Sequence, residues 1–356
     1  MMSGVSVTGV GSVLGSFGEA GAPQTANVSG SSGGVVPPPP HSPPTTSVLS
    51  SQVFDAKGVG LPGQYKLIFK NGDDMRQDQL IIQMVRLMDG QLKRLGLDLK
   101  LTPFSVIATS NNSGIMEMVL DSVPMSQVVE KYGRRGQGAA KNNPVMAFLQ
   151  EFSFHPTALY NIIPETMDTY VKSTAGYCVI TYLLGIGDRH LDNILLSKSG
   201  HFFHLDFGFI LGRDPKPFPP PMRLTQEMIS GMGGYDSENY TKFKSYCCQA
   251  YNILRRSAGL VTVLLQLMRD AGIEDLHPDP ATTIAKLYEK FRVDIEDEDA
   301  DKALLRLVDD SVAALFPAFL EVRDFGVLCH KYWNTALALR APPRFMDFLL
   351  PHPHAS

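Results

Sequence analysis

Cysteine is scarce in this sequence, with four residues in 356. Cys178, Cys247, Cys248 and Cys329 have neither the paired spacing of a zinc site nor the pattern of a disulfide-stapled secreted domain. We therefore expect reduced thiols in a cytoplasmic protein.

Long apolar runs are also missing. The chain has no run of the roughly 18 apolar residues that a membrane-spanning helix requires. Its start has neither the basic residues nor the continuous apolar core of a signal peptide, and its first basic residue is Lys57. We therefore expect the protein to meet membranes from outside, as a peripheral protein.

Neither sign of charge dominates. The formal net charge is −4, and charged residues make up 19% of the chain. This balance gives no overall attraction to nucleic acid, which we exclude as a partner, and any contact with anionic lipid must be local. A hydrophobic content of 44% is enough for one large or two ordinary domains with a buried core.

Charge is almost absent from the N-terminal segment. Residues 1–50 contain Gly, Ser, Pro, Val and Thr with one charged residue, Glu19. Such a segment buries too little apolar surface to offset its chain entropy. We predict that residues 1–52 are a disordered low-complexity segment, in which the four prolines at 37–40 form a stiff spacer.

From residue 65 onward, hydrophobic patterns predict a small lobe made of a sheet and a helix. The predicted elements are a strand at 65–70, a helix that runs from an N-cap at Asp73 or Asp74 to Arg94, and strands at 104–108 and 115–119. We assign residues 53–124 to this lobe.

The rest of the chain reads as a second, mostly helical lobe over residues 125–333, followed by an atypical tail at 334–356. A glycine-rich surface loop is expected at 133–143, and the acidic stretch at 294–301 reads as a solvated helix start. The predicted helices lie at 165–184, 225–231, 238–256, 259–271, 281–290 and 299–316. The predicted fold class is therefore α+β with two lobes.

Two motifs in the second lobe carry the chemistry. Residues 187–193 read Gly-Asp-Arg-His-Leu-Asp-Asn, and residues 205–208 read Leu-Asp-Phe-Gly. The apolar runs between them predict a tight β-hairpin, which brings Asn193 and Asp206 to the same end. There they can share a divalent cation that bridges phosphate oxygens, while Asp188 and His190 face an incoming hydroxyl.

The order of the first motif is informative. Protein kinases write this loop as His-Arg-Asp, whereas residues 188–190 here read Asp-Arg-His. The reversed loop together with Asp-Phe-Gly resembles the phosphatidylinositol 3-/4-kinase family. The stretches at 68–78 and 167–173 are similar to those of its class III 3-kinases, the vacuolar-sorting type, and the resemblance covers about residues 65–320.

The resemblance implies a two-lobed, protein-kinase-like fold that uses ATP with Mg²⁺ or Mn²⁺. It implies that Lys70 contacts the nucleotide phosphates and that Asp78 steadies the pocket. The backbones of Glu117 and Val119 would bind adenine at the hinge between the lobes, and Ile210 would be among the apolar side chains that sandwich the ring.

The resemblance further implies the roles of the four catalytic residues. Asp206 would hold the metal with Asn193 as the second ligand. Asp188 and His190 compete as the base, since an Asp orients a hydroxyl and a His accepts its proton. The family favours His190, with Asp188 in support.

The segment at 209–223 follows the second motif and is expected to bind the substrate. It lacks the Ala-Pro-Glu end of protein kinases. Its few basic residues are Arg213, Lys216 and Arg223. A headgroup with several phosphates would call for more cations, because each phosphate adds roughly −1.5 to −2 charge. Sparse charge suits phosphatidylinositol itself.

Two features depart from the family. The phosphate-covering loop expected upstream of the Lys70 strand falls in the low-complexity segment, with at most a remnant strand and turn at 53–63, so the first lobe reads as incomplete. Relatives also end soon after an aromatic pair, to which Tyr332 and Trp333 correspond only loosely. The lipid-binding and helical-repeat domains of the family are missing from this chain.

The expected activity is transfer of the ATP γ-phosphate to the 3-hydroxyl of phosphatidylinositol. The alternatives are a phosphatidylinositol 4-kinase, a related Ser/Thr protein kinase, and an inactive fragment or scaffold. The family also implies a regulatory kinase-like subunit, an autophagy scaffold, and peripheral association with endosomal or autophagosomal membranes.

Overall fold

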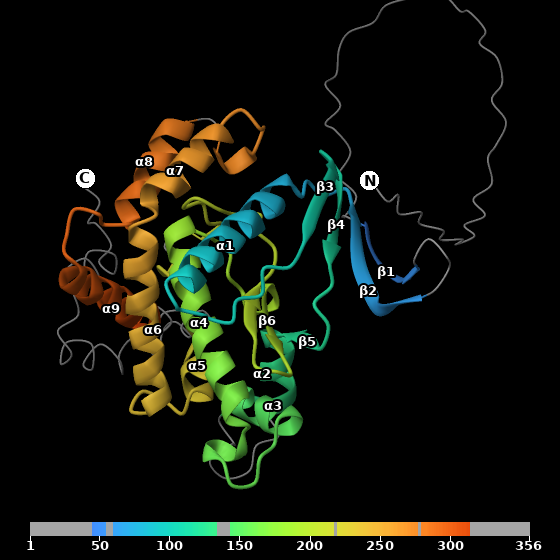
Figure 1. The fold of residues 1–356 in the computed structure, drawn as a ribbon, viewed down its shortest axis with the longest axis vertical. Coiled ribbons are helices and arrows are strands. Elements are labelled where there is room, and N and C mark those ends of the chain that lie inside the picture. Colours follow the sequence, from blue (N-terminus) through green and yellow to red (C-terminus); the bar gives the residue numbers. More distant parts are fainter. Residues whose placement is uncertain (1–44, 55–59, 134–142, 217–218, 277–278, 314–356) are drawn as a thin grey trace, which may run out of the picture.

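The computed structural model describes residues 45–54, 60–133, 143–216, 219–276 and 279–313. The strands of the first sheet lie with α1 at one end of the molecule, and α2 and α3 lie at the other (Figure 1). Long helices fill the space between. The chain therefore forms the two-lobed α+β fold that its sequence predicts.

Four antiparallel strands in the order β1-β2-β4-β3 form the first sheet. They are β1 (Thr45–Phe54), β2 (Gly60–Asn71), β3 (Val106–Ser110) and β4 (Ser113–Glu117). The three strands predicted here are confirmed, with shifted ends.

The first strand corrects one prediction. We expected disorder over residues 1–52, yet residues 45–54 pair with β2. Their Thr, Val, Leu and Phe favour extended backbone, and a lack of charge does not prevent a segment from pairing with a neighbouring strand. The remainder of the predicted disordered segment, residues 1–44, lies outside the described residues.

Helix α1 (Arg76–Arg94) packs against this sheet. Its apolar residues recur at helical spacing and lie on its buried face. Gln79 Oε1 accepts the N–H of Ala108 at 2.7 Å, which fixes the helix to β3.

The predicted N-cap of α1 at Asp73 or Asp74 is wrong. Met75 occupies the N-cap position, and its side chain makes no capping hydrogen bond. Asp74 instead accepts the N–H of Arg76 at 3.0 Å and pairs with its guanidinium. A carboxylate therefore still satisfies a backbone donor at this end, from one residue farther out.

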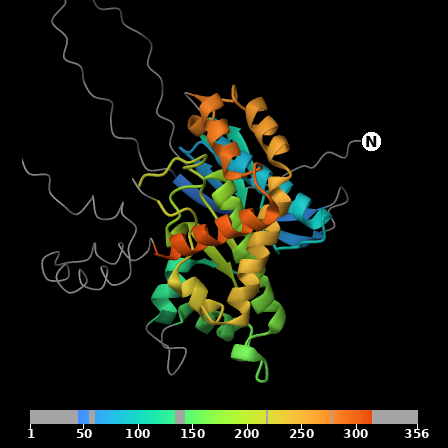
Figure 2. The same cartoon turned by 90° about the vertical axis from the view of Figure 1, so that its left-hand side faces the viewer.

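The second lobe is built around α4 (Pro164–Leu184), whose residues are buried on almost every side. It packs beside α6, and α9 crosses α6 (Figure 2). The other helices are α2 (Met125–Gly133), α3 (Pro144–Phe152), α5 (Gln226–Gly231), α6 (Glu238–Arg255), α7 (Ala258–Leu267), α8 (Pro280–Lys290) and α9 (Asp297–Ala313). Short 3-10 turns lie at Leu159–Asn161, Leu191–Asn193 and Glu274–Leu276.

Six of these helices were predicted and are confirmed within a few residues, whereas α2 and α3 were not predicted. Three acidic residues fill the first turn of α9, as expected of a solvated start. Most of the loop predicted at 133–143 and the tail predicted at 334–356 lie outside the described residues. Within the described part of the chain, no helix is long and apolar enough to cross a bilayer.

A second sheet holds the predicted hairpin. Its order is β5-β6-β7, and its strands are β5 (Ser122–Pro124), β6 (Ile194–Ser197) and β7 (Phe202–His204). Because β5 pairs with β6, residues 122–124 belong to the sheet of the second lobe, although we had assigned them to the first.

Arg255 fastens the last helices of the described chain to the core. Its side chain is 5% exposed. The guanidinium donates to the carbonyl oxygens of Phe291 at 2.9 Å, Arg292 at 2.5 Å and Ile295, and to the carboxylate of Asp297 at 2.9 Å. One buried cation thus supplies hydrogen-bond donors to the carbonyl oxygens of the turn between α8 and α9.

Replacing Arg255 by alanine should lower the free energy of unfolding by about 3 kcal/mol, because buried carbonyl oxygens lose their donors. Arg256→Ala is the matched control. Arg256 also pairs with Asp297 but is exposed, and its loss should cost less than about 1 kcal/mol. Urea unfolding followed by circular dichroism measures both, and equal losses would contradict the anchoring role of Arg255.

Candidate active site

The hairpin brings the two motifs together, as predicted. Ile194 pairs with His204, and the N–H of Leu205 donates to the carbonyl oxygen of Asn193 at 2.9 Å. Asn193 therefore enters the hairpin beside the point where Asp206 leaves it. His204 is 1% exposed, and burial holds its pKa well below the usual range, which confirms its predicted place in the core.

Arg189 joins the backbones of both motifs, a role that the sequence did not indicate. Its guanidinium donates to the carbonyl oxygens of Gly187 at 2.6 Å, Leu205 at 2.9 Å and Asp206. Burial lowers its pKa to about 10, against the opposing pull of nearby carboxylates, so Arg189 remains charged at neutral pH. The arginine between the two proposed catalytic residues is therefore a structural cation.

Oxygen atoms suited to a hard cation lie at the end of the hairpin. Asn193 donates its Nδ2 to the carbonyl oxygen of Asp188 at 3.2 Å, a bond that does not use its Oδ1. Asp206 accepts the N–H of Gly208 on Oδ1 at 3.1 Å, a bond that does not use its Oδ2. Asp188 and Asp206 both have left-handed backbones, with φ of 48° and 57°. This donor set fits Mg²⁺ or Mn²⁺.

Lys70 and Asp78 lie beside Asp206. Burial lowers the pKa of Lys70, but the hydrogen bond to Asp73 at 3.0 Å and the charges of Asp78 and Asp206 outweigh it, so the pKa is raised overall. Asp78 is 6% exposed and accepts the N–H of Phe207 at 3.1 Å. The structure therefore brings together a cation and carboxylates from β2, α1 and the second motif.

Burial raises the pKa of Asp78 to about 6, and the hydrogen bond from Phe207 and the charge of Lys70 offset only part of that rise. At neutral pH the group is mostly ionised. Burying the ionised carboxylate of Asp78 lowers the stability of the folded protein, because the neutral carboxyl group would be buried at a smaller cost.

The chain passes from the first lobe to the second through Glu117 and Val119. The N–H of Ser105 donates to the Glu117 carboxylate at 2.9 Å rather than to its carbonyl oxygen. The N–H of Met118 donates to the carbonyl oxygen of Lys66 at 2.9 Å. Glu117 and Val119 thus lie where the sequence predicted a hinge, and their binding to adenine stays a prediction.

Ile210 does not lie where we expected it. Its side chain is fully buried, and its N–H donates to Asp275 at 2.7 Å. The expectation that this side chain covers adenine is not supported. The chain turns at Asp206 and again at Leu211, where φ is 55°, and these turns direct Ile210 into the core.

Two carboxylates flank His190. Its Nε2 lies 3.8 Å from Asp188 Oδ2, and its Nδ1 lies 3.8 Å from Asp192 Oδ2. Ser126 at the start of α2 donates to the other oxygen of Asp192. The imidazole is half-exposed, and its Nδ1 is buried without a hydrogen-bond partner among the described residues, so Nε2 is the nitrogen that can meet a hydroxyl.

The three basic residues of the predicted substrate segment have different surroundings. Arg213 pairs with the buried carboxylate of Asp275, which makes it part of the scaffold and not a free cation. Arg223 is partly buried, and its Nε has no hydrogen-bond partner. Lys216 and Arg223 line a small cavity together with Asp188 and Arg189. Two of the three predicted residues therefore face the catalytic loop.

Asp214 ties this segment to the catalytic loop, a contact that sequence reasoning missed. Its carboxylate accepts the N–H groups of Asp188 and Lys216, each at 2.8 Å. Gly187 lies so close to the carbonyl oxygen of Arg213 that any Cβ there would clash. The two segments are thus in backbone contact.

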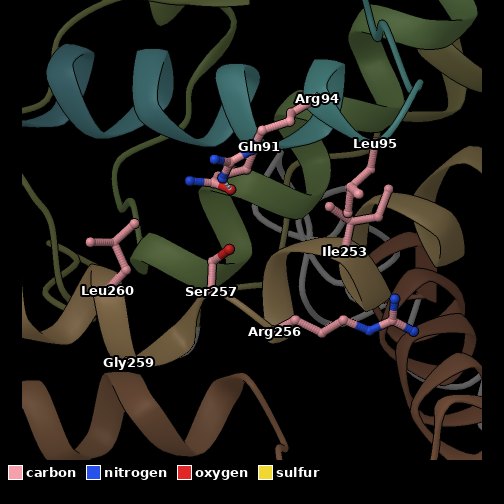
Figure 3. Close-up of a pocket in the computed structure, with 8 residues that line it drawn as sticks. All are labelled: Gln91, Arg94, Leu95, Ile253, Arg256, Ser257, Gly259 and Leu260. Atoms are coloured by element: carbon pink, nitrogen blue, oxygen red, sulfur yellow. Dashed lines mark hydrogen bonds between the residues drawn. The ribbon is translucent and has the colours of Figure 1, made fainter.

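A second cavity lies away from the motifs, with a volume of about 520 Å³. It opens between the end of α1 and the junction of α6 and α7 (Figure 3). Its lining includes Gln91, Arg94, Ser257 and Leu260, and none of the predicted site residues.

Asp78 predicts a pH dependence for the free protein without nucleotide or metal. The folded state binds the Asp78 proton more tightly than the unfolded chain does, so stability should fall as the pH rises from about 4 to about 6 and then level off. Asp78→Asn removes this pH-dependent contribution. Between pH 4 and 6 the free energy of unfolding of the variant should therefore rise, relative to that of the wild type, by at most about 3 kcal/mol.

Thermal unfolding of the wild type and of Asp78→Asn from pH 4 to 7.5 tests this prediction. Asp73→Asn, which also removes a carboxylate beside Lys70, is the control. A difference between Asp78→Asn and the wild type that does not change with pH would refute it.

Comparisons with known proteins agree with the geometry. A model of the phosphatidylinositol 3- and 4-kinase family matches residues 64–277. The chain is 50% identical over 259 residues to the root isoform of phosphatidylinositol 3-kinase from Glycine max, and equally so to phosphatidylinositol 3-kinase VPS34 from Arabidopsis thaliana. These matches cover 73% of this chain and 30% of each relative.

The VPS34 protein of Saccharomyces cerevisiae is 43% identical over 271 residues, which are 76% of this chain and 29% of that relative. The chain thus spans about three tenths of the length of the curated relatives it matches. The matched stretch contains all four motifs, at 68–78, 167–173, 187–193 and 205–208. As the motifs predicted, the chain belongs to the phosphatidylinositol 3- and 4-kinase family.

Proposed function

We propose that this chain is the catalytic domain of a phosphatidylinositol 3-kinase, which transfers the γ-phosphate of ATP to the 3-hydroxyl of phosphatidylinositol. The observation that carries the proposal is the 43–50% identity, over 259 to 271 residues, to proteins named phosphatidylinositol 3-kinase. The match to the family model over residues 64–277 includes every motif residue of the site. The relatives named 3-kinase favour this activity over a 4-kinase.

Lys70 neutralises phosphate charge in the proposed reaction, and Asp206 and Asn193 hold the metal. The bound Mg²⁺ or Mn²⁺ would withdraw negative charge from the transferred phosphate. Asp78 keeps Lys70 charged and holds Phe207, next to Asp206, through its N–H. Phosphoryl transfer depends mostly on such positioning and charge stabilisation.

His190 accepts the proton of the inositol hydroxyl in this proposal. It lies between Asp188 and Asp192, so a proton gained by the imidazole is stabilised from both sides. Asp188 supports it, as its N–H is held by Asp214.

The surroundings of the basic residues support a lipid with little phosphate. Arg213 is already paired with Asp275. Of the three basic residues of the segment, Lys216 and Arg223 therefore remain at the cavity beside Asp188. Two cations match the single phosphodiester of phosphatidylinositol better than a headgroup with several phosphates.

The cellular setting follows from the family and belongs to the proposal as well. We expect the protein to act on endosomal or autophagosomal membranes, with a regulatory kinase-like subunit and an autophagy scaffold as partners. A related Ser/Thr protein kinase and an inactive scaffold remain the alternatives that an activity assay decides.

The first test incubates the purified chain with labelled ATP, Mn²⁺ or Mg²⁺, and phosphatidylinositol vesicles, and identifies the product isomer. We expect the 3-phosphate. His190→Ala should lower kcat by about 10²- to 10⁴-fold, and Asp206→Ala should be at least as damaging.

His155→Ala is the control, because His155 is exposed and distant in sequence from both motifs, and it should keep wild-type turnover. A 4-phosphate product would assign the other branch of the family. Phosphorylation of a peptide but not of lipid would favour a protein kinase, and absence of any product would favour a scaffold.

Lys70→Met should weaken ATP binding about tenfold or more, since a charge-assisted contact to phosphate is lost. The measurement is the rise in melting temperature with increasing ATP and Mg²⁺. Lys66→Met, on the same strand, should bind ATP as the wild type does. Equal affinity of both variants would remove Lys70 from the nucleotide site.

A further inference from the structure

The segment after Asp206 is held by an acid that belongs to none of the motifs. Asp275 lies in the 3-10 turn Glu274–Leu276, between α7 and α8, and is 4% exposed. Its carboxylate accepts the N–H of Ile210 at 2.7 Å and the Nε2 of Gln77 at 3.1 Å, and pairs with Arg213. Two of these donors, Ile210 and Arg213, lie in the segment after Asp206, and the third, Gln77, lies on α1.

Gln77 extends this contact to the residue beside the proposed metal ligand. Its Nε2 also donates to the carbonyl oxygen of Phe207 at 2.9 Å, while its Oε1 accepts the N–H of Asp275 at 3.4 Å. The next residue of α1, Asp78, accepts the N–H of Phe207. Consecutive side chains of α1 thus bind both polar groups of the Phe207 backbone.

The chain just before the Glu274–Leu276 turn also contacts the start of α1. Arg76 Nη1 donates to the carbonyl oxygen of Ala271 at 3.2 Å. The segment that carries Asp275 therefore contacts both α1 in the first lobe and the backbone that follows Asp206.

From this arrangement we propose that Asp275 is a positioning residue, which fixes Asp206 relative to Lys70 by holding Gln77 and Ile210 at once. The inference rests on the proposed kinase activity. Phe207 and Ile210 both follow Asp206 within four residues, so holding their backbones fixes the chain as it leaves the turn at Asp206. Loss of Asp275 frees the Ile210 N–H and one side of Gln77 and leaves Asp206 with fewer constraints.

Ile210 and Gln77 both donate to Oδ2 of Asp275, whereas Arg213 pairs with Oδ1. An asparagine has nearly the same size and can keep the first two bonds on its single oxygen, but it loses the ion pair with Arg213. An alanine loses all three contacts. Asp275→Ala is therefore the decisive variant, and Asp275→Asn measures what the ion pair alone contributes.

We expect Asp275→Ala to lower kcat about 10- to 100-fold, because small misplacement of a reacting group is costly. The concentration of Mg²⁺ for half-maximal rate should rise, while KM for phosphatidylinositol should stay within about twofold. Glu274→Gln is the matched control. It is the exposed neighbour of Asp275 and also lies near Arg213, at 3.6 Å, and it should leave kcat unchanged.

Amide hydrogen exchange of the free protein tests the same inference without any activity. The peptide that spans residues 205–212 should exchange faster in Asp275→Ala than in the wild type and in Glu274→Gln, while peptides from α4 keep their protection. Unchanged exchange of this peptide, or a loss of protection across α4 of equal size, would overturn the positioning role.

The two arms separate the inference from the proposed function. If the wild type phosphorylates no lipid, the proposed function fails and the exchange experiment alone decides on Asp275. If the wild type is active and Asp275→Ala keeps the kcat and Mg²⁺ dependence of the wild type, the inference fails while the proposed function stands.

Discussion

The buried guanidinium of Arg189 is the constraint on which the site depends. It binds carbonyl oxygens of Gly187, Leu205 and Asp206, and so joins the catalytic loop to the segment that carries the proposed metal ligand. Burying a cation is expensive unless its donors are satisfied, and here carbonyl dipoles and nearby carboxylates do this. The two motifs therefore cannot separate without exposing a charge to an apolar interior, which makes them one rigid unit.

The parts of this fold that the sequence predicts are those set by local patterns. Period and spacing indicated the hairpin before Asp206 and the long helices α4 and α6, because a few neighbouring residues decide each of them. The strand at residues 45–54 was not predicted, because it is stabilised by pairing with β2 and the amino-acid composition of the segment does not indicate that pairing. The N-cap of α1 was misplaced by one or two residues, since a carboxylate serves a helix start from more than one position.

The site shows the same division. The grouping of Asp188, His190, Asn193 and Asp206 followed from two motifs and a turn. The placement of Ile210 did not, because left-handed backbone at Asp206 and Leu211 redirects the chain and no pattern of side chains encodes that redirection. Asp275 and Asp214 make contacts over long or irregular separations, and a single sequence gives no signal for them. For Asp275 and Asp214 the missing information was non-local packing, and for Ile210 it was the local backbone conformation.

The left-handed backbone of Asp206 has a consequence for how such proteins diverge. Asparagine is among the few residues other than glycine that adopt this conformation readily, and an aspartate codon becomes an asparagine codon by one base change. A lineage that took this step would keep the fold, the hairpin and the Arg189 contacts while losing the charge of the proposed metal ligand. Loss of the proposed catalysis is thus a short evolutionary path with little structural penalty, and a pseudokinase that arose in this way would look almost unchanged in shape.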